Sequence, residues 1–157
     1  MKVLGRTAVP GDKSISHRAL VISGISRGPS VIYGLNEGSD CCCTGRCLAE
    51  LGVSIRKKGS GWYVGGRGFD LEKTEDVLFC NDSGATLRML AGVLAGQDFL
   101  SFLDGGPSVR SRPMGAIIEP LRLMGADLFG AAGSNLAPLS IRGGKLTGIR
   151  YELPVPN

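Results

Sequence analysis

The sequence is poor in aromatic residues and in histidine, and it has no long apolar run. Only 6% of its 157 residues are aromatic, and His17 is the single histidine. Few aromatic rings argue against the stacking surfaces that bind single-stranded nucleic acid. No apolar run approaches the roughly 18 residues of a membrane-spanning helix, and the first residues lack the apolar stretch of a secretory signal. These absences predict a cytoplasmic protein with no membrane partner.

Cysteines are few and poorly spaced for disulfide bonds. The five are Cys41, Cys42, Cys43, Cys47 and Cys80, and an odd number with three adjacent members is a poor disulfide framework. Cys43 and Cys47 could share one face of a helix, yet no histidine or second cysteine pair completes a four-ligand metal site. We therefore expect no metal, and cysteines that face a core as small apolar side chains in a reducing compartment.

The chain instead has many glycines and a positive net charge. Its 25 glycines indicate frequent tight turns or close backbone approaches. A content of 43% hydrophobic and 20% charged residues is typical of a globular fold. The formal net charge of +4 suits an anionic ligand, but the basic residues are scattered and the only tight run is Arg56–Lys58. We therefore expect a small anionic ligand and no nucleic acid partner.

An internal repeat organises the chain. The segment CLAELGVSI (47–55) is similar to PLRLMGADL (120–128), because in both an amphipathic helix ends at a glycine and a short strand follows. Extending each match gives two βαβαββ modules, at 1–66 and 76–144. A third module seen in TGIRYELPV would occupy 147–157 and stop after one strand. We expect a mixed α/β (α+β) fold and a chain truncated within one incomplete domain.

Hydrophobic periodicity predicts the elements of each module. In the first module they are strand 3–9, helix 14–26, strand 30–35, helix 40–51, strand 53–57 and strand 61–64. In the second they are strand 76–80, helix 83–95, strand 99–103, helix 111–124, strand 126–129 and strand 138–142. Each module therefore has a turn between its first strand and its first helix.

The turn into the first helix, PGDKSISHRA (10–19), gathers Lys13, Ser14 and Arg18. A helix N-terminus offers unpaired N–H groups and a partial positive charge, so these side chains would complete a pocket for phosphate or carboxylate. The alternative is that Ser14 caps the helix while both cations are solvated. His17 has no nucleophile signature nearby, which favours a packing or helix-surface role over general-base catalysis.

The second module repeats this arrangement at NDSGATLRML (81–90). Gly84 would let a ligand approach the backbone closely, which favours a second anion site. The alternative is a plain helix start, with Asp82 or Ser83 as its cap.

The segment GGPSVRSRPMG (105–115) brings two more cations. Pro113 suits the first turn of a helix, and Arg110 or Arg112 could clamp a carboxylate or phosphate with two hydrogen bonds. The alternative is a loop with two solvated arginines.

Together, PGDKSISHRA, DSGATLRML and SVRSRPMG resemble signature segments of the 3-phosphoshikimate 1-carboxyvinyltransferase (EPSP synthase) family. The related UDP-N-acetylglucosamine enolpyruvyl transferases fit less well, because they have Lys-Asn at Lys13 and Ser14. The resemblance covers essentially the whole chain and implies βαβαββ modules arranged as an inverse α/β barrel, with about two of the family's six modules present. It also implies a transferase of the shikimate pathway, which leads to chorismate and aromatic amino acids. That enzyme moves the enolpyruvyl group of phosphoenolpyruvate to the 5-hydroxyl of shikimate 3-phosphate and uses no organic cofactor.

The resemblance also implies roles for particular residues. Lys13 would contact both substrates as the catalytic residue, and Ser14 and Arg18 would bind shikimate 3-phosphate. Gly84 and Arg112 would bind phosphoenolpyruvate, at the place where the inhibitor glyphosate binds in the family. A second domain carrying a catalytic Asp and Glu would be the missing partner of this chain.

Three positions depart from the family pattern. Asp82 stands where the family usually has Asn, Ala85 replaces a common Thr, and Asn157 falls where the family continues with Ser-Ala-Gln. We therefore expect enolpyruvyl transfer from the full-length parent, and an inactive, self-associating fragment. The alternatives are an anion- or RNA-binding domain built on the same modules, and a structural piece without catalysis.

Overall fold

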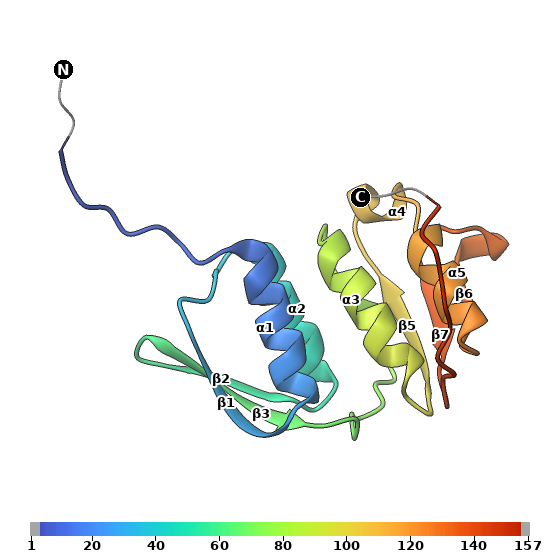
Figure 1. Ribbon diagram of the computed structural model, residues 1–157, viewed down its shortest axis with the longest axis horizontal. Coiled ribbons are helices and arrows are strands. Elements are labelled where there is room, and N and C mark those ends of the chain that lie inside the picture. Colours follow the sequence, from blue (N-terminus) through green and yellow to red (C-terminus); the bar gives the residue numbers. More distant parts are fainter. Residues whose placement is uncertain (1–3, 155–157) are drawn as a thin grey trace.

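Figure 1 shows the computed structural model, which describes residues 4–154. Its first half contains α1 (Lys13–Ile25), β1 (Arg27–Tyr33), α2 (Ser39–Glu50), β2 (Ser54–Lys58) and β3 (Gly61–Arg67). Its second half contains β4 (Leu78–Phe79), α3 (Gly84–Ala95), β5 (Leu100–Asp104), α4 (Pro107–Arg110), α5 (Gly115–Leu123), β6 (Asp127–Phe129), the 3₁₀ turn η1 (Ala131–Gly133) and β7 (Leu139–Arg142). Most predicted helices and strands are confirmed within a few residues of their expected bounds.

The two halves are built on separate sheets (Figure 1). The first sheet is antiparallel, with the order β1-β3-β2, and α1 and α2 pack against it. The second has the order β4-β5-β7-β6, in which β4 and β5 are parallel and the other neighbours antiparallel. Helix α3 contacts both α1 and α2, so the helices join the halves.

The first half lacks the leading strand predicted at 3–9. Residues 4–9 are exposed and form no strand, and residue 3 lies outside the described part of the chain. A strand needs a neighbour for its backbone hydrogen bonds, as β4 has in β5. The prediction is therefore wrong for 4–9. The edge of β1 that faces away from β3 has no strand beside it within residues 4–154.

The helix predicted at 111–124 forms as α5 but begins later than expected, because residues 111–114 make the turn that separates α5 from α4. Pro113 has no backbone N–H and disfavours helical backbone at Arg112, so the chain turns between the two helices. Pro113 therefore precedes α5 and does not lie in its first turn.

The strand expected to open a third module at 147–157 is not formed in residues 147–154. The backbone N–H of Thr147 donates to the carbonyl oxygen of Met124 at 2.8 Å, which holds this segment beside the end of α5. Residues 155–157 lie outside the described part of the chain.

One hydrophobic core extends through both halves. Its largest fully buried side chains come from helices and strands of each: Leu20, Leu48, Leu51, Leu78, Leu87, Leu90, Leu94, Leu103, Met114, Ile118, Leu128 and Leu139. Burial on this scale supplies most of the favourable free energy of folding. The core therefore fixes the position of the helices, and with them the turns at their N-termini.

Most cysteines belong to this core, as predicted. All five are free thiols, and only Cys42 is exposed. A hydrogen bond with Cys47, together with burial, raises the pKa of the Cys43 thiol above its usual value, so this thiol stays neutral. Within residues 4–154 no group of three or more His, Cys, Asp or Glu could hold a metal ion.

The helices in the described part of the chain are all too short or too polar to cross a membrane.

A glycine in each half lets the chain pass closely over the C-terminal end of the first helix of that half. A Cβ atom on Gly66 would lie 2.3 Å from the carbonyl oxygen of Ser23, at the end of α1. A Cβ atom on Gly143 would lie 2.4 Å from the carbonyl oxygen of Leu94, at the end of α3. One glycine of the Gly-Gly pair that ends each module is therefore required for packing, and both halves share this requirement.

We predict that Gly66→Ala and Gly143→Ala each lower the free energy of unfolding by about 1–3 kcal/mol, because a rigid backbone oxygen occupies the space of the new methyl group. Urea unfolding followed by circular dichroism measures the loss. Gly144→Ala is the matched control, since a Cβ there meets nothing within 4 Å, and we expect a change within about 0.5 kcal/mol. Equal losses at Gly143 and Gly144 would contradict this explanation.

We also predict that the purified chain forms dimers through the unpaired edge of β1, because free strand edges pair readily with each other. Large apolar side chains of this strand are exposed, with Val31 at 43% and Tyr33 at 70%. Light scattering over a range of concentrations measures the state. Val31→Lys should shift the dimer towards monomer, and a wild-type chain that stays monomeric at high concentration would show the prediction to be wrong.

Candidate anion-binding site

The N-terminal turns of α1, α2 and α3 lie together. Lys13, at the start of α1, forms an ion pair with Asp40 in the first turn of α2. The backbone oxygen of Asp40 accepts a hydrogen bond from the hydroxyl of Thr86, in the first turn of α3, at 3.3 Å. Each helix N-terminus carries a partial positive charge, so three such ends face one region of the molecule.

At the start of α1, Asp12 is the cap, with its Oδ1 accepting from the backbone N–H of Ile15 at 2.7 Å. The capping role that was the alternative for Ser14 is therefore wrong. The Ser14 hydroxyl instead accepts a hydrogen bond from Arg18 Nη1 at 2.8 Å, and both side chains are exposed. Because the Ser14 oxygen accepts from Arg18, its own proton is free to donate to an anion.

Asn36, in the loop after β1, fixes the turn that precedes α1. Its side-chain amide donates to the carbonyl oxygen of Gly11 at 2.8 Å, and its backbone N–H donates to the hydroxyl of Ser16 at 2.9 Å. A Cβ atom on Gly11 would overlap the carbonyl oxygen of Gly34 at 1.8 Å, so this close approach requires glycine. Beside it is a hollow of about 120 Å³ lined by Lys13, Asn36, Gly38, Ser39, Asp40 and Cys41.

A chain of buried side-chain hydrogen bonds joins the three helices. His17 Nδ1 lies 2.7 Å from Thr44 Oγ1, which lies 2.7 Å from Thr86 Oγ1. The Thr86 hydroxyl is in turn 2.7 Å from that of Ser83. All four side chains are buried and out of reach of water, so their polar atoms depend on one another for hydrogen bonds. The chain therefore fixes the start of α3 relative to α1 and α2.

His17 is the first residue of this series of hydrogen bonds, and its imidazole is neutral. Burial, and after it the neighbouring Lys13 ammonium, lower the pKa of His17 below its usual value. Its Nε2 atom has no hydrogen-bond partner within residues 4–154. This buried position agrees with the packing role predicted for His17.

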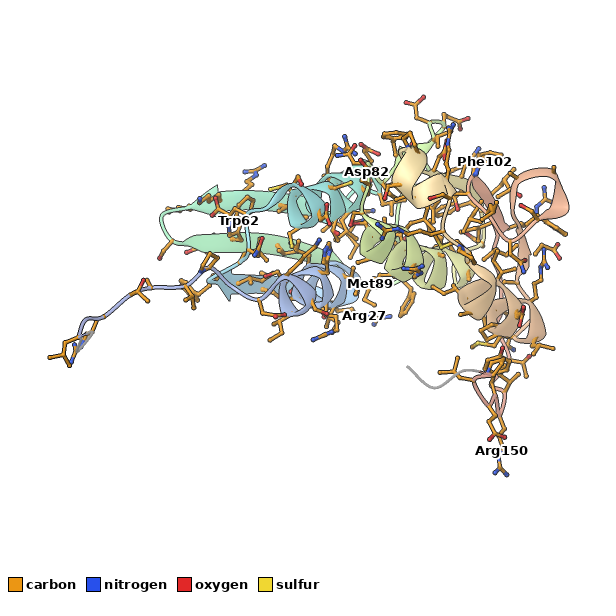
Figure 2. The ribbon with its side chains drawn as sticks, turned by 90° about the horizontal axis from the view of Figure 1, so that it is seen from above. Arg27, Trp62, Asp82, Met89, Phe102 and Arg150 are labelled. Carbon is orange, nitrogen blue, oxygen red and sulfur yellow. The ribbon has the colours of Figure 1, made fainter. Side chains whose placement is uncertain are left out.

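At the start of α3, Ser83 is the cap, because its hydroxyl accepts from the backbone N–H of Thr86 at 3.2 Å. Of the two alternatives from the sequence, Ser83 is therefore correct and Asp82 is not. Asp82 lies in the loop before α3 (Figure 2). Its carboxylate lies against Gly106 at the start of α4, where a Cβ would meet Asp82 Oδ1 at 2.5 Å.

Gly84 follows this cap and is flanked by two arginines. A Cβ atom on Gly84 would lie 3.1 Å from Nη1 of Arg112 and 3.3 Å from Nη1 of Arg88. The structure therefore brings Gly84 and Arg112 together, as the sequence suggested. Sequence reasoning missed Arg88, although the spacing of four residues from Gly84 places it one helical turn further along α3.

The structure separates the roles of Arg110 and Arg112, which the sequence left open. Arg110 forms a bidentate ion pair with Asp104, in which its Nε lies 2.9 Å from Oδ1. This hydrogen-bonded pair holds the pKa of the Asp104 carboxyl below its ordinary value. Arg112 donates only to the hydroxyl of Ser108, at 3.0 Å, and forms no ion pair within residues 4–154. Arg112 is therefore the arginine that remains available to an anion.

The expected residues thus lie in two groups on neighbouring helix starts. Lys13, Ser14 and Arg18 lie on α1, while Gly84 and Arg112 lie at α3 and the loop before α5. Asp40, Thr44 and Thr86, which join the groups, were missed because nothing in a linear pattern reveals contacts over 27 or 42 residues of separation.

Comparison with known proteins gives one consistent result. A sequence model described as EPSP synthase (3-phosphoshikimate 1-carboxyvinyltransferase) matches residues 1–157. The 3-phosphoshikimate 1-carboxyvinyltransferase of Alkaliphilus metalliredigens is 46% identical over 155 residues, which are 98% of this chain and 36% of that protein. The 3-phosphoshikimate 1-carboxyvinyltransferase of Herpetosiphon aurantiacus is 48% identical over 155 residues, which are again 98% of this chain and 36% of that protein.

A solved structure agrees in fold. The EPSP synthase from Acinetobacter baumannii superposes with a TM-score of 0.92 at 37% identity, over 98% of this chain and 35% of that one. This likeness confirms the predicted mixed α/β fold. The chain spans about a third of the length of the relatives it matches. By its sequence and by its fold, this chain belongs to the EPSP synthase (3-phosphoshikimate 1-carboxyvinyltransferase) family.

Proposed function

We propose that a polypeptide containing this chain transfers the enolpyruvyl group of phosphoenolpyruvate to the 5-hydroxyl of shikimate 3-phosphate. The observation that carries the proposal is family membership together with the cations that lie at the neighbouring starts of α1 and α3. We assign the protein to the cytoplasm, in keeping with its five free thiols.

Shikimate 3-phosphate is assigned to the start of α1. Lys13 and Arg18 supply charge for its phosphate, and the Ser14 hydroxyl, which accepts from Arg18 at 2.8 Å, still has a proton to donate. These side chains are exposed, so a ligand reaches them without any rearrangement of the core.

Phosphoenolpyruvate is assigned to the start of α3. Arg112 is free of carboxylates among the described residues and can form two parallel hydrogen bonds with an oxyanion. Gly84 leaves open the space next to Arg112 that a side chain would fill, since a Cβ there would lie 3.1 Å from Nη1. The hydrogen-bond chain through Thr44 and Thr86 holds this pocket beside Lys13.

Both substrates are multiply anionic, so placing them side by side costs repulsion that the cations offset. The 5-hydroxyl gives up its proton as its oxygen adds to the enol carbon bearing the phosphate, and the methylene carbon takes up a proton. Loss of phosphate from this tetrahedral intermediate, together with a proton from the new methyl group, then restores the double bond. In this proposal the residues of the chain hold and orient the two anions, with Lys13 between them. The catalytic gain comes from orientation and from preorganised charge.

We predict that Lys13→Ala or Arg112→Ala, made in the longest polypeptide that the gene encodes, lowers kcat/KM by one to several orders of magnitude. Each variant removes charge-assisted hydrogen bonds worth about 1.5–3 kcal/mol apiece. Steady-state phosphate release with both substrates measures the effect.

Arg110→Ala is the control for this experiment. It removes the same charge two residues away, at the end of α4, but it breaks the ion pair with Asp104, which is only 7% exposed. We therefore expect a lower thermal stability for Arg110→Ala and a larger kinetic loss for Arg112→Ala. Near-normal kinetics in both Lys13→Ala and Arg112→Ala would show that these assignments are wrong.

We further predict that the 157-residue chain alone releases no phosphate from the two substrates, because the resemblance assigns the catalytic Asp and Glu to a second domain. The same phosphate assay, run on the purified chain, checks this. Turnover by the chain would contradict it. A salt-sensitive gel shift with RNA and no binding of shikimate 3-phosphate would instead favour the RNA-binding alternative.

A further inference from the structure

A cavity of about 220 Å³ lies between α2 and the first sheet. Leu20 on α1, Ile55 on β2 and Trp62 on β3 form part of its wall, and Figure 2 labels Trp62. The side of the cavity formed by α2 consists of Cys41, Cys42, Gly45, Arg46 and Ala49. None of the residues assigned to a substrate lines this cavity, so it is a second place where the protein could hold a small molecule.

Gly45 leaves this cavity open. It lies in the middle of α2, where glycine is less stable than alanine because its backbone loses more conformational freedom on folding. No close backbone approach requires a glycine here, since the atom nearest to a Cβ would be Ile55 Cδ1 at 3.9 Å, an ordinary contact distance. A longer apolar side chain at this position would extend into the cavity. The helix therefore loses stability at Gly45 and leaves space between α2 and β2.

The polar side chains in the wall of the cavity are already bonded to other parts of the protein. Trp62 Nε1 donates to Glu37 Oε1 at 3.3 Å. Arg46 donates to the carbonyl oxygen of Phe79 and lies 3.7 Å from the carboxylate of Glu50. Both cysteine thiols in the wall donate to backbone oxygens. A charged ligand would lose its hydration without gaining a free partner, so the cavity favours an uncharged one.

We propose that this cavity binds one small uncharged aromatic molecule, whose ring contacts Leu20, Ile55 and Trp62. An apolar cavity of about 150 Å³ is large enough to hold benzene, so the present one has room for a substituted benzene. A flat ring is favoured over an alkyl chain because it can pack against the indole of Trp62. This site does not depend on the proposed function.

The test titrates the 157-residue chain with bromobenzene and follows the fluorescence of Trp62, the single tryptophan of the sequence. Bromine quenches indole emission on contact, so the wild type should show saturable quenching. Gly45→Leu should weaken binding at least tenfold, because the new side chain occupies the cavity. Ala49→Leu, at an exposed position of the wall, should weaken it as well.

Gly92→Leu is the matched control. Gly92 is an exposed glycine within α3, and a Cβ there would meet nothing within 4 Å. This variant should change the affinity for bromobenzene less than twofold. Circular dichroism confirms that each variant is folded. Equal binding by the Gly45→Leu and Gly92→Leu variants would overturn the proposal, and so would quenching of the wild type that does not saturate.

The chemistry of the ligand is tested with para-bromobenzoate, which adds one negative charge to the same ring. It should bind at least tenfold more weakly than bromobenzene, and equal or tighter binding would show that the site is not one for uncharged molecules. Calorimetry with bromobenzene on the longest polypeptide that the gene encodes should give an affinity within tenfold of that of the 157-residue chain. The absence of binding there would also refute the proposal.

Discussion

The candidate site depends on a buried contact between two threonine hydroxyls. Thr44 and Thr86 lie 2.7 Å apart and join α2 of the first half to α3 of the second. The starts of these helices carry partial charges of the same sign and repel each other weakly, while the hydrophobic core holds the helices in place. The hydroxyl contact, its extensions to His17 and Ser83, and the carboxylate of Asp40 beside Lys13 offset that repulsion. The cations on either side are neighbours because the core positions the helices and this contact fixes their first turns against each other.

The sequence predicts the helices well because their apolar spacing reflects the core they bury. Helix α3 was expected at 83–95 and forms over 84–95, with Leu87, Leu90 and Leu94 fully buried. Strands are predicted less well, because a strand also depends on a neighbour that its own residues do not encode. Residues 4–9 have the composition of a strand but no partner within the described chain.

Residues of the candidate site could be predicted where their type alone is unusual at that position in the sequence. Lys13, Gly84 and Arg112 stand out because a cation or a glycine next to a helix start has few common uses. Asp40 and Thr86 do not stand out, since an acidic residue or a threonine in a first helical turn is ordinary. Their importance comes from the approach of helices far apart in sequence, and only the folded chain shows it. The choice between Arg110 and Arg112 likewise required the position of Asp104.

The ion pair between Lys13 and Asp40 has a consequence for selectivity among anions. An ammonium group that already has a carboxylate neighbour carries little net field at a distance, so a singly charged ion such as chloride gains little by approaching it. A ligand with several charges gains more, because it also reaches Arg18 and the starts of the neighbouring helices. The Asp40 carboxylate weakens the attraction of any anion to Lys13, so a net gain there requires a ligand that also contacts the neighbouring cations.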